Sequence, residues 1–217
     1  MTARRHYGIL GSMKITVGNL KGGTAKTTSS MFLALGLGQS GRTLLVDADP
    51  QASASDWAEN TEDWPETVTV IPWATRDLAK RIGQVAGDYD HVVIDTAPGN
   101  DVILRQALLA TDHFVVPVTP SPMELRRLRP SFELAAEVDA ISPVWAHVLL
   151  CKVRKKSQAL GEAHNLLEHL DLPTFETAIH LWDTYLLAWG SAPADVEEYA
   201  DLINELRASD AETKETA

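Results

Sequence analysis

The residues best suited to chemistry lie in one short glycine-rich segment near the start of the chain. Residues 21–28 read KGGTAKTT, between a strand-like run over 14–17 and a helical pattern. A glycine-rich turn that leads from a strand into a helix presents backbone N–H groups to an anion at the positive end of the helix. The segment therefore predicts a phosphate-binding loop, in which Lys26 reaches the β- and γ-phosphates, Thr27 ligates Mg²⁺ and Thr28 hydrogen-bonds a phosphate.

The loop departs from the strict pattern G-x-x-x-x-G-K-[ST], because Leu20 and Ala25 stand in place of its two glycines. What remains is K-G-G-x-x-K-T, whose five fixed positions would match by chance in a chain of this length with a probability on the order of 10⁻⁴. The alternative interpretation is a glycine turn that carries two surface lysines. The strand before the segment and the helix after it favour the phosphate loop.

Three aspartates stand where strand-like runs end. Asp47 ends the run over 43–47 and Asp49 follows it, and Asp95 ends the run over 91–95. Because parallel strands end at one edge of a sheet, these carboxylates are expected beside the phosphate loop. Carboxylates there can accept Mg²⁺ and its waters and can orient an attacking water. The alternative for each aspartate is a helix cap or a turn residue.

These segments resemble the deviant Walker A ATPases of the ParA/MinD group, first of all in the phosphate loop. The resemblance implies that Lys21 is the signature lysine, which reaches the partner's phosphates across an ATP-sandwich homodimer. The residues it places at ATP are Lys21, Gly22, Gly23, Thr24, Ala25, Lys26, Thr27 and Thr28. The group usually has glycine at the position of Ala25, so alanine is expected to be tolerated there only with a negative φ.

The same resemblance covers the later strand ends. Asp49 lies in a segment similar to switch I, where it would position or deprotonate the attacking water, so Lys21, Lys26 and Asp49 are the expected catalytic residues. Asp95 matches the Walker B aspartate, which holds Mg²⁺ through water, with Thr27 as the direct ligand. Asp47 is expected to be a strand-end or outer-shell Mg²⁺ group, and residues 96–99 resemble switch II.

A proline-rich stretch follows the strand-like run over 113–117. By the resemblance, Pro117, Thr119 and Pro120 lie beside the adenine, and the alternative is a rigid loop. The sequence holds no Asn/Thr-Lys-x-Asp segment that would read guanine, so ATP with Mg²⁺ is the expected cofactor.

Strand-like and helical patterns alternate along the chain, which predicts an α/β fold. The expected architecture is a mostly parallel twisted sheet with helices on both faces. Strands are expected at 14–17, 43–47, 67–71, 91–95, 113–117, 144–150 and 174–179, and helices at 26–39, 75–86, 101–110, 130–140, 157–170 and 194–208. One ATPase domain is expected over 13–208, with a disordered extension over 1–12 and a frayed acidic tail over 209–217. In the last helix, an apolar face of Val196, Tyr199, Ala200, Ile203 and Leu206 is expected to dock on the body.

The charge of the chain is segregated. Its 19 basic and 30 acidic residues give a formal net charge of −11, which by itself argues against nucleic acid and anionic membranes as partners. The acid is concentrated over 195–217, however, whereas 121–156 is locally basic. The candidate DNA-binding residues are Arg126, Arg127, Arg129, Lys152, Arg154, Lys155 and Lys156. The alternative is a solvated basic face or a set of ion pairs within the chain.

Composition indicates which kind of member of the ParA/MinD group the chain resembles. A single cysteine excludes the iron–sulfur relatives and favours a reducing, cytoplasmic setting. The acidic C-terminus is unlike a MinD-type membrane helix, so no membrane partner is expected. The chain thus resembles small partition-type ParA proteins without an N-terminal DNA-binding domain.

The resemblance implies a nucleoid-associated ATPase that dimerises on ATP, binds DNA non-specifically and hydrolyses ATP when a partner stimulates it. The expected partner is a ParB-like centromere-binding or cargo adaptor protein, and the expected cargo is a plasmid or chromosome centromere complex. One alternative is a positioning ATPase for a non-DNA cargo, such as an organelle, a secretion complex or a polysaccharide-synthesis complex. The other alternative is a metabolic ATP-dependent ligase or kinase of the same fold.

Overall fold

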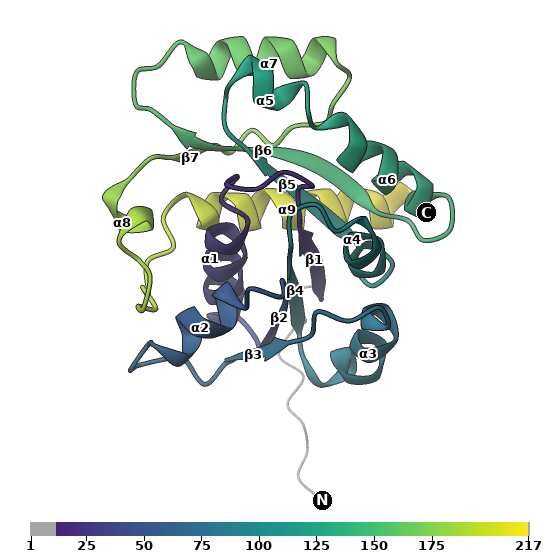
Figure 1. Ribbon diagram of the computed structural model, residues 1–217, viewed down its shortest axis with the longest axis vertical. Coiled ribbons are helices and arrows are strands. Elements are labelled where there is room, and N and C mark those ends of the chain that lie inside the picture. Colours follow the sequence, from purple (N-terminus) through teal and green to yellow (C-terminus); the bar gives the residue numbers. More distant parts are fainter. Residues whose placement is uncertain (1–11, 217) are drawn as a thin grey trace, which may run out of the picture.

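A computed structural model describes residues 12–216 and shows seven parallel strands in one sheet, in the order β3-β2-β4-β1-β5-β6-β7 (Figure 1). The strands are β1 (Met13–Val17), β2 (Thr43–Ala48), β3 (Val68–Pro72), β4 (His91–Thr96), β5 (His113–Val118), β6 (Trp145–Val153) and β7 (Ile179–His180). Strand β1 lies at the centre, so the phosphate loop that follows it opens in the middle of the carboxyl edge. Ligands of open α/β sheets bind at that edge.

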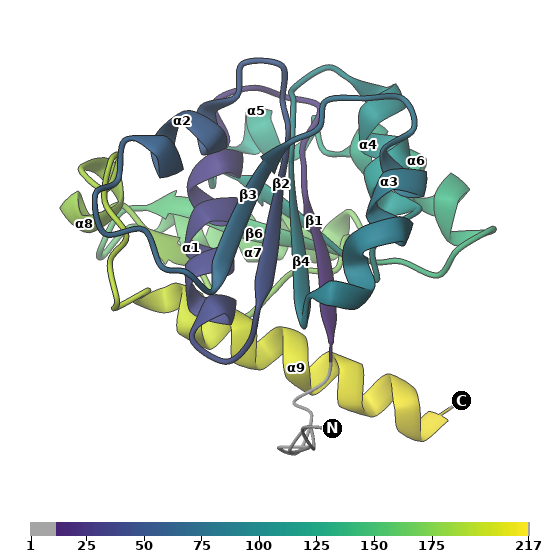
Figure 2. The same cartoon turned by 90° about the horizontal axis from the view of Figure 1, so that it is seen from below.

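Helices cover both faces of the sheet (Figure 2). They are α1 (Lys26–Gly38), α2 (Ser53–Glu59), α3 (Leu78–Val85), η1 (Ala86–Asp88), α4 (Asp101–Leu108), α5 (Pro122–Leu125), α6 (Arg129–Asp139), α7 (Ala159–His169), α8 (Asp183–Leu186) and α9 (Glu198–Thr216). Helices α1, α2 and α9 lie on one side, and α3, α4 and α6 on the other.

The central strands β2, β4, β1 and β5 are buried on both faces, as their β-branched and leucine-rich runs predict. In β2, Leu45 packs in the core cluster formed with α1, α2 and α9, whereas Leu44 and Val46 pack in the cluster formed with α3 and α4. The alternation of side chains along a strand explains this division. The predicted α/β fold with a parallel sheet is therefore confirmed.

The last third of the chain differs from the predicted elements. The final strand is only β7, and Thr174 contributes an isolated bridge to Val148 instead of starting a longer strand. Helix α9 begins at Glu198 and continues to Thr216, through most of the tail that we expected to be frayed. The short helices α2, α5 and α8 were not predicted, because fewer than two turns leave little periodic pattern. The expected disordered extension lies, except for Ser12, outside the described residues.

Helix α9 docks on α1, as its apolar face predicts. Tyr199, Leu202, Ile203 and Leu206 are buried, but Ala200 is exposed, so Leu202 takes the place that we expected for Ala200. A β-carbon on Gly36 of α1 would lie 2.6 Å from Ile203 Cδ1, so the two helices approach closely only because residue 36 is glycine. Within the described residues, no helix has both the length and the apolar character needed to cross a bilayer.

Candidate nucleotide-binding site

The loop between β1 and α1 is held by neighbours from β4 and β5. Gly18 N–H donates to Val115 O at 3.1 Å, and a β-carbon on Gly18 would lie 2.7 Å from Thr96 Oγ1. Asn19 Nδ2 donates to Pro117 O at 2.9 Å, and its Oδ1 accepts from Lys21 N–H at 3.0 Å. These contacts fix the start of the loop, which the adjacent strands therefore preorganise.

Lys26, the lysine that we expect to bind phosphate, is the buried cation of the loop. Only 7% of the residue is exposed, and Nζ donates to the carbonyl oxygen of Lys21 at 2.9 Å. Burial lowers the pKa of its amine, and the carboxylates of Asp95 and Asp49 oppose that shift. The ammonium thus sits inside the loop on a neutral acceptor, which a phosphate can replace.

Lys21 forms an ion pair with Glu124 of α5. Glu124 is 9% exposed, so this carboxylate is held against the loop and not free in solvent. In this structure the predicted signature lysine is therefore bound within its own chain. A role toward a partner's phosphates would require it to leave Glu124.

Ala25 immediately precedes α1 and has φ 72° and ψ 23°, in the left-handed region. This corrects our expectation that alanine is tolerated there only with a negative φ. Ala25 O accepts from Ser29 N–H in the first hydrogen bond of α1, so the left-handed residue stands directly at the start of the helix. The loop therefore keeps the shape that glycine normally provides and carries the strain of a side chain.

Replacing Ala25 by glycine should stabilise the protein, because glycine adopts the left-handed region without strain. We expect Ala25→Gly to raise the free energy of unfolding by about 1 kcal/mol in urea titrations. Ala34→Gly, in the middle of α1, is the matched control and should lower it by a similar amount. A decrease for Ala25→Gly would show that the loop does not keep this conformation in solution.

Asp95 and Thr27 meet at the base of the loop. Thr27 Oγ1 donates to Asp95 Oδ2 at 2.7 Å, and Ser30 Oγ donates to Asp95 Oδ1 at 3.0 Å. Burial raises the pKa of Asp95 to about 7, opposed by the hydroxyls of Thr27 and Ser30 and by Lys26. A hydroxyl and a carboxylate side by side are the oxygen donors that Mg²⁺ prefers, so these residues fit the predicted magnesium site.

Ser30 was not predicted as part of the site. It lies three residues after Thr27 on α1, so both hydroxyls face β4 from the same side of the helix. That spacing was the available signal, but a serine in a helix is too common to single out. Its hydroxyl also donates to Lys26 O at 3.1 Å.

Asp47 lies near the end of β2 and Asp49 follows the strand, on the same sheet edge. Asp47 is fully buried, and its two oxygens accept from the backbone N–H groups of Asp49 at 3.2 Å and Ser55 at 2.8 Å. Burial raises the pKa of Asp47, opposed by those N–H groups. Asp47 thus shapes the turn into α2, and its role as a magnesium group stays a prediction. Asp49 is half-buried and accepts from Gln51 N–H at 2.9 Å.

A small hollow opens on the far side of the loop, toward the ends of β6 and β7. It is lined by Ala25, Thr28, Cys151, Lys152, Ile179, His180, Leu181, Tyr185, Leu186 and Tyr199. Lys152 Nζ donates to Gly23 O at 2.9 Å. Pro117 lies near the end of β5, where Asn19 binds its carbonyl oxygen, and Thr119 and Pro120 follow the strand. Their place beside the adenine stays a prediction.

The candidate DNA-binding residues fall into two separate groups. Arg126 and Arg129 line a groove with Leu125, Phe132 and Leu172, and Arg129 Nε pairs with Glu133 at 2.7 Å.

The other group begins with Lys152 at the phosphate loop. In the part of the chain that the structure describes, Arg154, Lys155 and Lys156 pair with no carboxylate, although Lys155 Nζ lies 5.1 Å above the ring of Trp182. These three bases are therefore available for phosphates outside the chain, as are the exposed Arg126 and Arg127 of the first group, which also pair with no carboxylate in the described residues.

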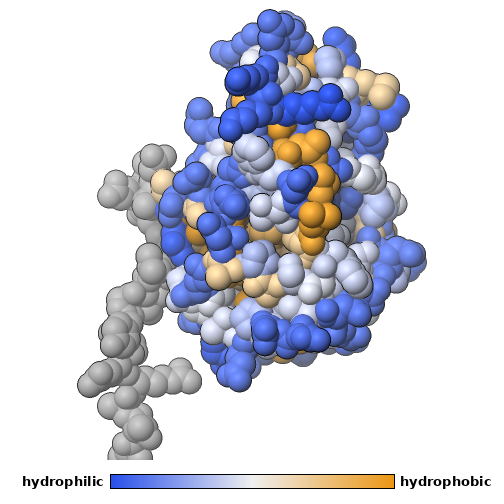
Figure 3. Space-filling model, turned by 90° about the vertical axis from the view of Figure 1, so that its left-hand side faces the viewer, coloured by the Kyte–Doolittle hydropathy of each residue, from blue (hydrophilic) through white to orange (hydrophobic). Residues whose placement is uncertain are grey.

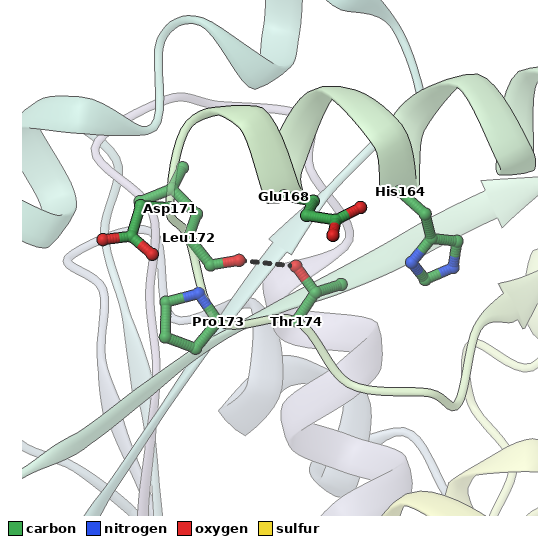
Figure 4. A pocket seen from close by; sticks show the side chains of 6 residues that line it. All are labelled: His164, Glu168, Asp171, Leu172, Pro173 and Thr174. Carbon is green, nitrogen blue, oxygen red and sulfur yellow. Dashed lines mark hydrogen bonds between the residues drawn. The ribbon is translucent and has the colours of Figure 1, made fainter.

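Another hollow lies under α7, away from the phosphate loop (Figure 4). His164 and Glu168 come from α7, whereas Asp171 points away from both. Thr174 Oγ1 donates to Leu172 O at 3.0 Å. Among the described residues no group of three or more His, Cys, Asp or Glu side chains could hold a metal ion, so this hollow is not a metal centre.

The parallel sheet, the loop before α1 and the Thr27–Asp95 pair define a P-loop nucleotide-binding protein. A family model described as an AAA domain matches residues 12–71 and 66–140. One relative is a protein from Gloeobacter kilaueensis named "Maintenance of carboxysome distribution protein A". It is 35% identical to this chain over 79% of this chain and 78% of its own length. The chain belongs to the AAA-domain family and, within it, to the ParA-type ATPases.

Two solved structures share the fold. A variant of McdA from Cyanothece in complex with ATP superposes with a TM-score of 0.70, at 20% identity, over 83% of this chain and 88% of that chain. The other is cobyrinic acid a,c-diamide synthase from Mycobacterium smegmatis with bound ADP and magnesium. It superposes with a TM-score of 0.70, at 20% identity, over 90% of this chain and 95% of that chain. The same fold therefore occurs in one protein solved with ATP and in another solved with ADP and magnesium.

Proposed function

We propose that this ParA-type ATPase positions a protein cargo, such as an organelle, on DNA by cycles of ATP binding and hydrolysis. The supporting observation is the 35% identity, over 79% of the chain, to a protein named for maintaining carboxysome distribution. Our principal expectation from the sequence, partition of a plasmid or chromosome, has less support. A ligase or kinase remains a weaker candidate, because only the fold supports it.

In the proposed cycle, each loop residue has a distinct task. Lys26 and the backbone N–H groups that open α1 bind the β- and γ-phosphates, and Thr27 with Asp95 holds Mg²⁺. Magnesium supplies positive charge to the phosphate oxygens as the terminal phosphoryl group leaves. Asp49, at the same edge, orients the attacking water.

ATP binding then forms a homodimer in which Lys21 of one protomer reaches the nucleotide of the other. Arg154, Lys155 and Lys156 of both protomers together meet about six phosphates of DNA, so the log–log salt slope is about −5. A single protomer with half of these contacts binds far more weakly. Dimerisation can therefore control DNA binding without any further change in shape.

A protein adaptor completes the cycle. On the side that carries α8, the surface shows an apolar strip (Figure 3). In α8 and directly after it, Leu186, Leu187 and Trp189 are 59%, 78% and 61% exposed. Contiguous apolar surface of this kind is typical of protein contacts. Its presence supports an adaptor that links the ATPase to its cargo and stimulates hydrolysis.

DNA binding against salt concentration tests the proposal, measured with ATP, with ADP and without nucleotide. We expect tight, salt-sensitive binding with ATP only, and faster ATP hydrolysis when DNA is combined with the cognate adaptor protein. ATP-loaded protein without affinity for DNA at low salt would refute positioning on DNA. Transfer of phosphate to a small molecule would favour the metabolic candidate instead.

The contact between Lys21 and Glu124 gives a prediction for the proposed dimer. Glu124→Gln removes the carboxylate that holds Lys21 within its own chain, while the side chain keeps its size. We expect the ATP-dependent dimer to form at an approximately 3- to 10-fold lower protein concentration in sedimentation velocity, equivalent to about 0.7–1.4 kcal/mol.

The effect should depend on Lys21. In a Lys21→Ala background, Glu124→Gln should leave dimerisation unchanged, because no ammonium is left to release. Glu133→Gln, which removes an exposed carboxylate on α6, is the matched control. Weaker dimerisation of Glu124→Gln would mean that Glu124 positions Lys21 for the dimer and does not restrain it.

A further inference from the structure

Along β6, successive side chains point to opposite faces of the sheet, and this alternation is interrupted at Lys152. Leu150 and Val153 pack in the same core cluster, whereas Cys151 packs in the cluster on the opposite face. In a regular strand, Val153 would share a face with Cys151 and Lys152 would share one with Leu150. One additional residue has therefore been inserted into the strand between Cys151 and Val153.

The pairing of β6 with β7 shows the same insertion. Cys151 pairs with Ile179 and Val153 pairs with His180, so two steps along β6 match one step along β7. Lys152 has a φ of 57°, in the left-handed region, where a side chain is strained. A bulge of this kind commonly redirects one side chain next to a functional site.

The redirected side chain reaches the phosphate loop. Lys152 is exposed, and its Nζ donates to the carbonyl oxygen of Gly23 at 2.9 Å, across 129 positions in sequence. The same side chain lines the small hollow that Ala25 and Thr28 border at the start of α1. Lys152 is thus the third lysine on this loop, after Lys21 and Lys26.

We propose that Lys152 is a nucleotide-binding residue that contacts the phosphates of ADP or ATP bound in its own protomer, an inference that rests on the proposed function. A neutral carbonyl is a weaker acceptor for an ammonium than a phosphate oxygen is. Bound nucleotide therefore draws Nζ from Gly23 O to a phosphate. The bulge keeps the ammonium at the loop and away from both packed faces of the sheet.

A DNA contact is the competing role, since Lys152 begins the basic segment that also holds Arg154, Lys155 and Lys156. The hydrogen bond to Gly23 favours the nucleotide, because it directs Nζ into the loop. The exposed side chain of Lys156 provides a close comparison, since its φ is 63° and its backbone is left-handed too. Lys156 differs in having no hydrogen bond to the loop among the contacts of the described residues.

Titration calorimetry with ADP and Mg²⁺ separates the two roles. We expect Lys152→Gln to weaken ADP affinity about 10-fold, the effect of one lost charge-assisted hydrogen bond, and Lys152→Arg to recover most of it. Lys156→Gln is the matched control and should bind ADP as the wild type does. The deficit of Lys152→Gln should shrink as salt rises, because screening weakens a charged contact.

Wild-type ADP affinity in Lys152→Gln would overturn the proposal, and a smaller DNA salt slope in that variant would then assign Lys152 to DNA. A deficit that stays constant with salt and is accompanied by a lower melting temperature would also overturn it, since Lys152 would then only support the loop. A wild-type protein that does not bind ADP would refute the proposed function itself, so the two failures can be told apart.

Discussion

Lys26→Ala should abolish detectable nucleotide binding, with ADP affinity reduced by at least about 100-fold. Lys26 is the buried cation of the loop, and its Nζ rests on Lys21 O at 2.9 Å, inside the turn that receives the phosphates. Each hydrogen bond to a charged group contributes about 1.5–3 kcal/mol, and this ammonium can serve more than one phosphate oxygen. Without it, the carboxylates of Asp95 and Asp49 would lose the buried cation that lies between them and the phosphates.

Calorimetric titration with ADP and Mg²⁺ measures this loss directly. Lys80→Ala, which removes an exposed lysine from α3, is the control and should bind ADP normally. Circular dichroism must show that Lys26→Ala remains folded, because the buried amine also interacts with Asp95. A folded variant that binds ADP within 10-fold of the wild type would show that another lysine of the loop carries the phosphate contact.

The central residues of the nucleotide-binding site could be predicted from the sequence, because short segments of the chain determine where each of them lies. The glycine-rich turn, Lys26 and Thr27 are set by one strand-to-helix connection, and Asp95 follows from the end of a buried strand. The structure brings Thr27 and Asp95 together at 2.7 Å although they lie 68 positions apart. Parallel strands that all end at one edge make such a meeting predictable.

Other parts of the site depend on tertiary contacts that no local pattern records. The Lys21–Glu124 pair joins residues 103 positions apart through α5, a four-residue helix that has too few turns for a periodic signal. The bulge at Lys152 is equally hidden, since an apolar run with one lysine fits a regular strand. Periodicity predicts which faces are apolar, but it does not reveal where one residue has been inserted.

The pattern of charges in the sequence is also not sufficient to identify the residues that would contact DNA. The basic stretch over 121–156 predicted seven DNA-binding candidates, but Arg129 pairs with Glu133 and Lys152 binds the loop. Lys21 and Arg129 show that a cation read from sequence can already have a partner in the fold. Among the described residues, five exposed bases pair with no carboxylate and keep the arrangement that contact with DNA requires: Arg126, Arg127, Arg154, Lys155 and Lys156.

Asp49→Asn should bind ATP normally and lose turnover by about 10²- to 10³-fold, the usual cost of removing a group that orients or deprotonates water. Asparagine is the informative replacement because its Oδ1 can still accept from Gln51 N–H, the bond that Asp49 makes at 2.9 Å. Asp49→Ala lacks that acceptor. If ATP hydrolysis depends on the carboxylate and not on the shape of the turn, Asp49→Ala should lose as much turnover as Asp49→Asn.

The trapped state distinguishes this role from a general loss of function. With ATP, Asp49→Asn should accumulate as a dimer and stay on DNA, whereas the wild type dissociates as ATP is consumed. Rapid-quench measurement of phosphate release, with sedimentation of the ATP-loaded protein, provides both readouts. If Asp49→Asn hydrolyses ATP at the wild-type rate while Asp49→Ala does not, the turn after β2 is essential and its carboxylate is not. The water would then be oriented by another group at the same sheet edge.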